Sequence, residues 1–66
     1  MNIIVNGQAT EVAERQTVAD VLRELGLPPV RVAVERNEDL VSRRDFEQTE
    51  LSPGDRLEIV TFVGGG

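Results

Sequence analysis

Residues 17–26 read TVADVLRELG, and this stretch predicts a helix with both of its ends marked. Thr17 can accept a hydrogen bond from a free backbone N–H of the first turn, and Asp20 stands at the spacing of a capping box. Apolar residues recur at i, i+3, i+4 and i+7 and form one stripe, which comprises Val18, Val21, Leu22 and Leu25. Gly26 is typical of the left-handed residue that ends a helix, and the two prolines that follow prevent the helix from resuming. We expect the stripe to pack on a sheet.

A β-hairpin is expected before this helix. Residues 2–5 are rich in β-branched side chains, and Asn6-Gly7 follows them. Asn-Gly is the strongest short-range hairpin signal, because a two-residue type I′ turn needs positive φ at both positions. Residues 9–13 are then the returning strand, and their polar content is typical of the edge of a sheet.

Three further strands are expected after the helix, at residues 30–35, 40–44 and 56–63. The segment 37–39 is a polar turn, and 52–55 is a tight turn with proline and glycine at favourable places. The short strand is expected to end in the basic pair Arg43-Arg44. Residues 45–51 are weakly patterned, and we expect them to hold Phe46 against the core.

The order hairpin, helix, strand, short strand, strand predicts an α+β fold. A strand that returns beside the hairpin after the helix requires a right-handed crossover, so the sheet becomes mixed. We expect a β-grasp domain over residues 1–63, with four or five strands and one helix packed on one face. Residues 64–66 are expected to be a flexible glycine tail.

The composition of the 66 residues excludes several classes of protein. A net charge of −5 and two aromatic residues disfavour nucleic-acid binding, which relies on phosphate neutralisation. The chain has no cysteine or histidine, so cysteine or serine–histidine nucleophiles and the usual metal sites are not expected. No apolar run is long enough for a membrane span, and no signal peptide is apparent. We therefore expect a cytoplasmic protein that is not an enzyme by itself, with no catalytic residues, metal or bound cofactor of its own.

Period-2 alternation places Leu57 and Ile59 towards the helix and Glu58, Val60 and Phe62 on the uncovered face of the sheet. Ala33 of the neighbouring strand is expected to extend this apolar patch, and Ile4 of the first strand is a further candidate. Exposed apolar patches rimmed by charge mark binding surfaces, so Val60, Phe62 and Ala33 are the candidate partner-binding residues. The alternative is that Phe62 folds back onto the core.

The chain reads Gly64-Gly65-Gly66 at its end, directly after this apolar strand. Glycine accepts backbone angles that other residues refuse and can pass through a narrow channel. A free α-carboxyl is ionised at neutral pH and can act as an oxygen nucleophile. The tail is therefore a candidate reactive arm, with a frayed terminus as the alternative.

Two segments resemble a known family, the ThiS sulfur carriers of thiazole (thiamine) biosynthesis. They are VAVERN at residues 32–37 and GDRLEIVTFVGGG at residues 54–66, and the resemblance extends over nearly the whole chain. Members often carry proline where this chain has Ser42 and tryptophan where it has Phe46, which affects a loop and a packing residue. The resemblance implies a ubiquitin-like β-grasp fold.

The resemblance also implies a mechanism. A ThiF-like adenylating enzyme, using ATP and magnesium, would bind the open sheet face and receive Gly64 and Gly65 in its active site. The Gly66 carboxylate would become an acyl-adenylate and then a thiocarboxylate. The sulfur would come from a cysteine desulfurase or a rhodanese-like donor and pass to a thiazole synthase.

Three other functions remain open from the sequence. The small subunit of molybdopterin synthase shares the fold and the tail chemistry. A ubiquitin-like modifier would be joined to lysines of target proteins. A plain interaction domain would make no chemical use of its glycines.

Overall fold

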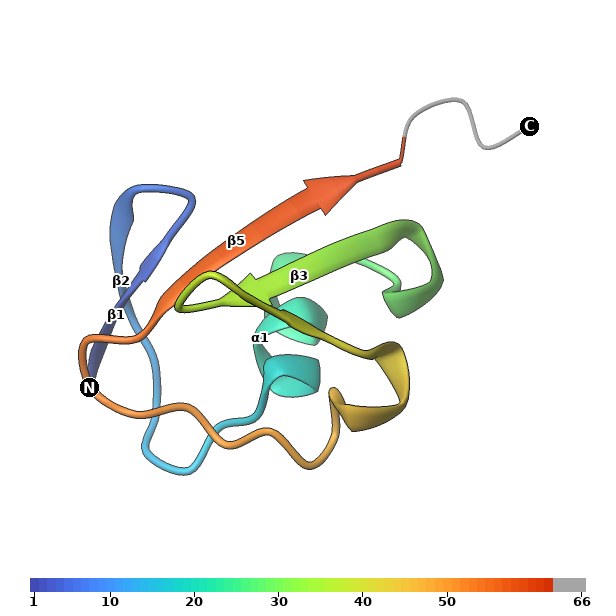
Figure 1. Cartoon of the computed structure of the whole chain (residues 1–66). Helices are drawn as coiled ribbons and strands as arrows, with labels where there is room; N and C mark the ends of the chain where they lie inside the picture. The colour runs from blue at the N-terminus through green and yellow to red at the C-terminus, as the bar shows by residue number, and fades with distance from the viewer. Residues whose placement is uncertain (63–66) are drawn as a thin grey trace.

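The computed structural model describes residues 1–62, and within them five strands and one α-helix form two layers (Figure 1). The elements are β1 (Asn2–Val5), β2 (Gln8–Glu11), α1 (Val18–Leu25), β3 (Val32–Arg36), β4 (Asp39–Val41) and β5 (Arg56–Thr61), with short 3₁₀ helices η1 (Pro29–Arg31) and η2 (Arg43–Asp45). Val63, the last residue of the final predicted strand, and the predicted tail 64–66 lie outside the described residues. No helix among residues 1–62 has the length and apolarity needed to cross a membrane.

The predicted hairpin is confirmed. Asn6 and Gly7 have φ values of 50° and 81°, as a two-residue type I′ turn requires. The returning strand begins one residue earlier than predicted, because so short a turn places Gln8 directly opposite Val5. It ends at Glu11, opposite the first residue of β1, so the predicted end at Ala13 is wrong. β2 lies at the edge of the sheet, as its polar residues indicated.

Both ends of α1 agree with the prediction. The Thr17 hydroxyl accepts a hydrogen bond from the Asp20 N–H at 3.2 Å, and the Asp20 carboxylate accepts one from the Thr17 N–H at 3.0 Å. Gly26 follows in the left-handed conformation with φ 72°, where its N–H donates to carbonyls of the last turn. Local hydrogen bonds therefore define where the helix begins and where it ends.

The segment between η2 and β5 runs beside the start of α1. The N–H groups of Val18 and Ala19 donate to the carbonyls of Thr49 and Phe46, at 3.0 Å each. These helix N–H groups have no partner inside the helix, so the adjoining segment supplies their acceptors. The Phe46 side chain is buried, which confirms its predicted role in the core.

Two details of the predicted strands are wrong. The third strand was expected from residue 30, but residues 29–31 form η1, because two prolines fix φ and the Arg31 N–H closes a turn onto the Pro28 carbonyl at 3.0 Å. The basic pair Arg43-Arg44 does not end a strand, because it belongs to η2, which turns the chain back under the sheet.

The strand order is β2-β1-β5-β3-β4, so the sheet is mixed, as predicted. β5 pairs parallel with β1 and antiparallel with β3. The expectation that the strand following the helix returns beside the hairpin is therefore wrong, since β5 occupies that place. β5 is the longest of the described strands, and its side chains Leu57 and Ile59 are buried. Because β5 lies between β1 and β3, its backbone N–H and C=O groups find partners on both sides.

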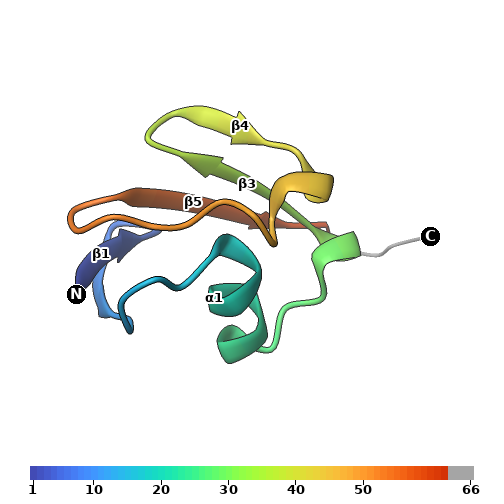
Figure 2. The same ribbon diagram turned by 90° about the horizontal axis from the view of Figure 1, so that it is seen from below.

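The core lies between α1 and one face of the sheet. Its buried side chains come from the helix, the strands and the segment around Phe46, and they are Ile3, Val12, Val18, Ala19, Val21, Leu22, Val32, Val34, Phe46, Leu51, Leu57 and Ile59. Figure 2 shows α1 on one side of the sheet, with no described element on the other side. One face of the sheet is therefore left free for contact with another molecule.

Candidate functional site

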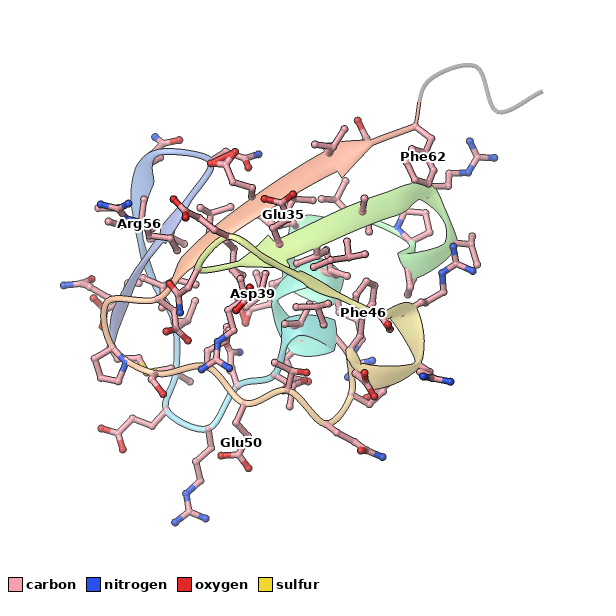
Figure 3. The ribbon with its side chains drawn as sticks, in the orientation of Figure 1. Glu35, Asp39, Phe46, Glu50, Arg56 and Phe62 are labelled. Atoms are coloured by element: carbon pink, nitrogen blue, oxygen red, sulfur yellow. The ribbon has the colours of Figure 1, made fainter. Side chains whose placement is uncertain are left out.

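Alternation along β5 places two apolar side chains on the uncovered face. Leu57 and Ile59 are buried against the helix, whereas Val60 is 59% exposed and Phe62 is 51% exposed. The predicted phase of this strand is confirmed, and the alternative in which Phe62 folds back onto the core is wrong. Figure 3 shows Phe62 where β5 leads into the C-terminal segment. The apolar patch thus adjoins the start of the predicted tail.

The structure brings Ala33 to this patch but does not bring Ile4 there. Ala33 of β3 lies directly opposite Val60 and is half-buried. Ile4 lies on the same face but opposite Arg56, which is four residues before Val60 and so about 13 Å away along the strand. Ile4 therefore belongs to the far end of the face.

Sequence reasoning missed Leu40. This β4 side chain is 71% exposed, and it lies opposite Glu35 on the same face as Ala33. The position of Leu40 could have been predicted from the two-residue turn Asn37-Glu38. Such a turn pairs Arg36 with Asp39 and therefore Glu35 with Leu40. We define the open face as six of the side chains on this side of the sheet, which come from β3, β4, β5 and the residue after β5: Ala33, Glu35, Leu40, Glu58, Val60 and Phe62.

The Asn6 side chain holds the middle of β5. Its amide donates to the Ile59 carbonyl at 3.1 Å, and its carbonyl accepts from the Ile59 N–H at 2.7 Å. The side chain thereby continues the ladder beyond Val5, the last residue of β1. Beyond Ile59, β3 continues to support β5, and the Phe62 N–H donates to the Arg31 carbonyl at 2.8 Å. The end of the strand is thus kept extended towards the C-terminal segment.

A buried carboxylate fixes the start of β5. Asp55 is 6% exposed and accepts hydrogen bonds from the Ser52 N–H at 2.7 Å, the Arg36 Nε at 2.9 Å and the Asn37 Nδ2 at 3.1 Å. Burial acts to raise the pKa of Asp55, but the bonds from Ser52, Asn37 and Arg36 outweigh it and hold the pKa below its ordinary value. This network secures β5 to the turn between β3 and β4.

The open face offers a candidate docking surface. No group of three or more potential metal ligands occurs within residues 1–62. The carboxylate expected to react, that of Gly66, and the threading residues Gly64 and Gly65 lie outside the described residues. The described part of the chain therefore presents an apolar and acidic surface next to the origin of the C-terminal segment.

Comparison with known proteins identifies the relatives of this chain. The sequence model that describes the ThiS family matches residues 3–66 of this chain. The chain belongs to the ThiS family. A crystal structure of the ThiS thiamine biosynthesis protein from Geobacter metallireducens is 36% identical, covers both chains completely and superposes with a TM-score of 0.84. The ubiquitin-like β-grasp fold is thereby confirmed for this ThiS-family chain.

Two curated relatives differ in how much of their length the chain spans. The sulfur carrier protein ThiS of Bacillus subtilis is 40% identical over 50 residues, which are 76% of each chain. The thiazole synthase of Paramagnetospirillum magneticum is 41% identical over 66 residues, which are all of this chain and 20% of the synthase. The chain thus spans a fifth of that relative's length.

Proposed function

We propose that this ThiS-family chain is the sulfur carrier of thiamine biosynthesis, with the carboxylate of Gly66 as its working group. The chain is itself no enzyme in this proposal, and a ThiF-like adenylating enzyme, with ATP and Mg²⁺, performs the activation. The observation that carries the proposal is the match of the family model through residue 66, together with an open face beside the origin of the tail.

The activation takes place in three steps. A Gly66 carboxylate oxygen attacks the α-phosphorus of ATP, and pyrophosphate leaves, which gives an acyl-adenylate. The terminal sulfur of a persulfide, formed on a cysteine desulfurase or a rhodanese-like donor, then attacks the carbonyl carbon, and AMP leaves. A second thiol reduces the resulting acyl disulfide, so that the thiocarboxylate is released and the two thiol sulfurs become a disulfide.

A thiazole synthase is the proposed acceptor of this sulfur. The Paramagnetospirillum relative named thiazole synthase contains a segment that is 41% identical to the whole of this chain. A carrier segment within a synthase supports a working association between the two, since one covalent chain gives a high effective concentration. We place the pathway in the cytoplasm, where ATP is available to the adenylating enzyme.

The open face supplies docking energy in this proposal. Ordering the backbone of a residue costs roughly 1–2 kcal/mol, and glycine loses more freedom than any other residue. Gly64 and Gly65 must be ordered in the active site of the partner, so contacts elsewhere have to offset the cost. Val60, Phe62 and Ala33 are placed to make those contacts, and remote binding of this kind positions a reacting group.

The test combines the chain with the ThiF-like enzyme of the same organism. We expect exchange of labelled pyrophosphate into ATP that depends on the carrier, and a mass increase that corresponds to one sulfur replacing one oxygen once the persulfide donor is added. Isopeptide adducts on target lysines would instead identify a protein modifier, and an unchanged terminus would identify a plain interaction domain. A strain that lacks the gene for this chain should require thiamine for growth, which distinguishes this role from that of a molybdopterin synthase subunit.

A variant in the tail is the matched control. Gly65→Leu adds a side chain where a narrow channel is expected, so it should abolish exchange while the melting temperature stays that of the parent. Parent rates of exchange in Gly65→Leu would contradict threading of the tail into the enzyme.

A further inference from the structure

Two glutamates lie directly opposite each other on the open face. Glu35 of β3 pairs with Glu58 of β5, and both residues are exposed. The Phe62 N–H donates to the Arg31 carbonyl, so Arg31 and Phe62 are a hydrogen-bonded pair of the antiparallel ladder. Such pairs recur at every second position, so Glu35 and Glu58 are also a hydrogen-bonded pair, with Cα atoms about 5.5 Å apart. Like charges at such positions destabilise a sheet.

No cation within residues 1–62 neutralises this pair by an ion pair of 4.0 Å or less. Arg36 follows Glu35 but faces the helix side, where its Nε is bound to Asp55. Arg56 lies opposite Ile4 and extends towards β1 and β2 (Figure 3). The free chain therefore keeps an unfavourable contact next to the apolar side chains of the open face.

Apolar side chains of the open face flank the pair on two sides, and Arg56 is the next β5 residue on its third side. Ala33 and Val60 are the next pair on this face, about 7 Å away towards the C-terminal segment. Leu40 lies on the other side of Glu35 and is 71% exposed. A partner that covers these residues removes water from the carboxylates, which makes an ion pair there stronger and an unpaired carboxylate costlier.

We propose that Glu35 and Glu58 together bind one arginine side chain of the adenylating partner, an inference that rests on the proposed function. A guanidinium has five N–H donors in a planar fork and can serve two carboxylates at once, which an ammonium does less well. The repulsion between the two carboxylates is relieved only in the complex, so docking gains from a contact that weakens the free chain. The pair thus selects a partner with an apolar surface and a central arginine.

The test uses Glu35→Gln, Glu58→Gln and the double variant in the full chain, with the ThiF-like enzyme of the same organism and no ATP. Glutamine keeps the shape of the side chain and removes the charge. The matched control is the double variant Glu14→Gln/Glu50→Gln, which also changes the net charge from −5 to −3. Both control glutamates are exposed outside the sheet, and Figure 3 shows Glu50 on the far side of the molecule from Glu35.

We expect the double variant at 35 and 58 to lose at least about tenfold in affinity by calorimetry at low salt. The losses of binding free energy in Glu35→Gln and Glu58→Gln should not add up to the loss in the double variant, because both carboxylates share one cation. The same double variant should unfold at a higher urea concentration than the parent, since the repulsion is gone. The control pair should show neither effect.

Parent affinity in the double variant at 35 and 58 would overturn the proposal, and so would an equal loss in the control, which would indicate general charge steering. A drop in the unfolding midpoint of the double variant would overturn it as well, because the pair would then be stabilising. If the parent supports pyrophosphate exchange in these cases, the proposed function survives and this inference alone fails. A parent that supports no exchange overturns both.

Discussion

At the residue scale, three polar side chains determine where β5 lies. Asn6 bonds both backbone groups of Ile59, Asn37 accepts from the Arg56 N–H at 2.9 Å, and Asp55 gathers three donors in a buried position. Apart from the bond between Ser52 and Asp55, which lies within one turn, these bonds join turns or strands that are distant in sequence. The strand that leads into the C-terminal segment is therefore positioned by specific hydrogen bonds as well as by packing.

Asp55→Asn should destabilise the fold by about 1.5–3 kcal/mol, because the hydrogen bonds to a charged acceptor are weakened and Arg36 loses its partner. Urea denaturation at neutral pH measures the change. Asp39→Asn is the control, since Asp39 is exposed and its side chain makes no hydrogen bond within residues 1–62. Equal stability of the two variants would show that the Asp55 network is dispensable.

The stabilising effect of Asp55 should also depend on pH. Its pKa lies below the ordinary value of about 3.9 when the chain is folded, so the unfolded chain binds this proton first as the pH falls. The contribution is complete above that ordinary pKa and is lost as the pH falls through the folded pKa. The difference in unfolding free energy between parent and Asp55→Asn should therefore be constant above about pH 5 and shrink below about pH 4. A difference that is unchanged at low pH would contradict the assignment.

At the element scale, the Asn6 side chain acts as an extension of β1. Asn6→Gly suits the positive φ of 50° and removes only the side-chain bonds, so we expect a cost of about 1–3 kcal/mol from two lost hydrogen bonds. Amide hydrogen exchange at Ile59 should become faster, while exchange at Leu22 in the helix should change only with global stability. Unchanged protection at Ile59 would show that β3 alone holds this strand.

The turn between β3 and β4 contains a strained residue. Asn37 and Glu38 have φ values of 52° and 75°, and a left-handed conformation costs roughly 1–2 kcal/mol for a residue with a side chain such as that of Glu38. Glycine removes this cost but loses about 0.4–1 kcal/mol of stability through the greater entropy of the unfolded chain, so Glu38→Gly should raise the free energy of unfolding by up to about 1.6 kcal/mol. Thermal unfolding measures it, and a lower melting temperature would show that the Glu38 side chain stabilises the turn.

At the scale of the whole molecule, the helix protects one face of the sheet and leaves the other to a partner. Phe62→Asp should weaken binding to the adenylating enzyme by about tenfold or more, because a charge replaces an apolar contact on a surface that the partner covers. Leu25→Asp is the matched control, since Leu25 is 48% exposed against 51% for Phe62 but lies on the helix. Calorimetry that gives both variants the affinity of the parent would remove Phe62 from the docking surface.

Much of the candidate site was accessible from the sequence because its pattern is local. The phase of β5 follows from the alternation of Leu57 and Ile59 with Val60 and Phe62, and the structure has that phase. Leu40 and the pairing of Glu35 with Glu58 were not accessible in the same way. Both depend on the register between strands, and a shift of one residue would have moved every side chain to the other face.

Local sequence patterns were sufficient to predict the capped helix, the type I′ hairpin and the apolar alternation of β5, because hydrogen bonds and steric limits within a few residues decide them. The position of β5 between β1 and β3, and hence the meeting of two glutamates on the open face, became known only from the complete fold. Strand order depends on which arrangement buries most apolar surface and satisfies most backbone groups across segments that are up to 53 positions apart, as Asn6 and Ile59 are. No local pattern contains that information.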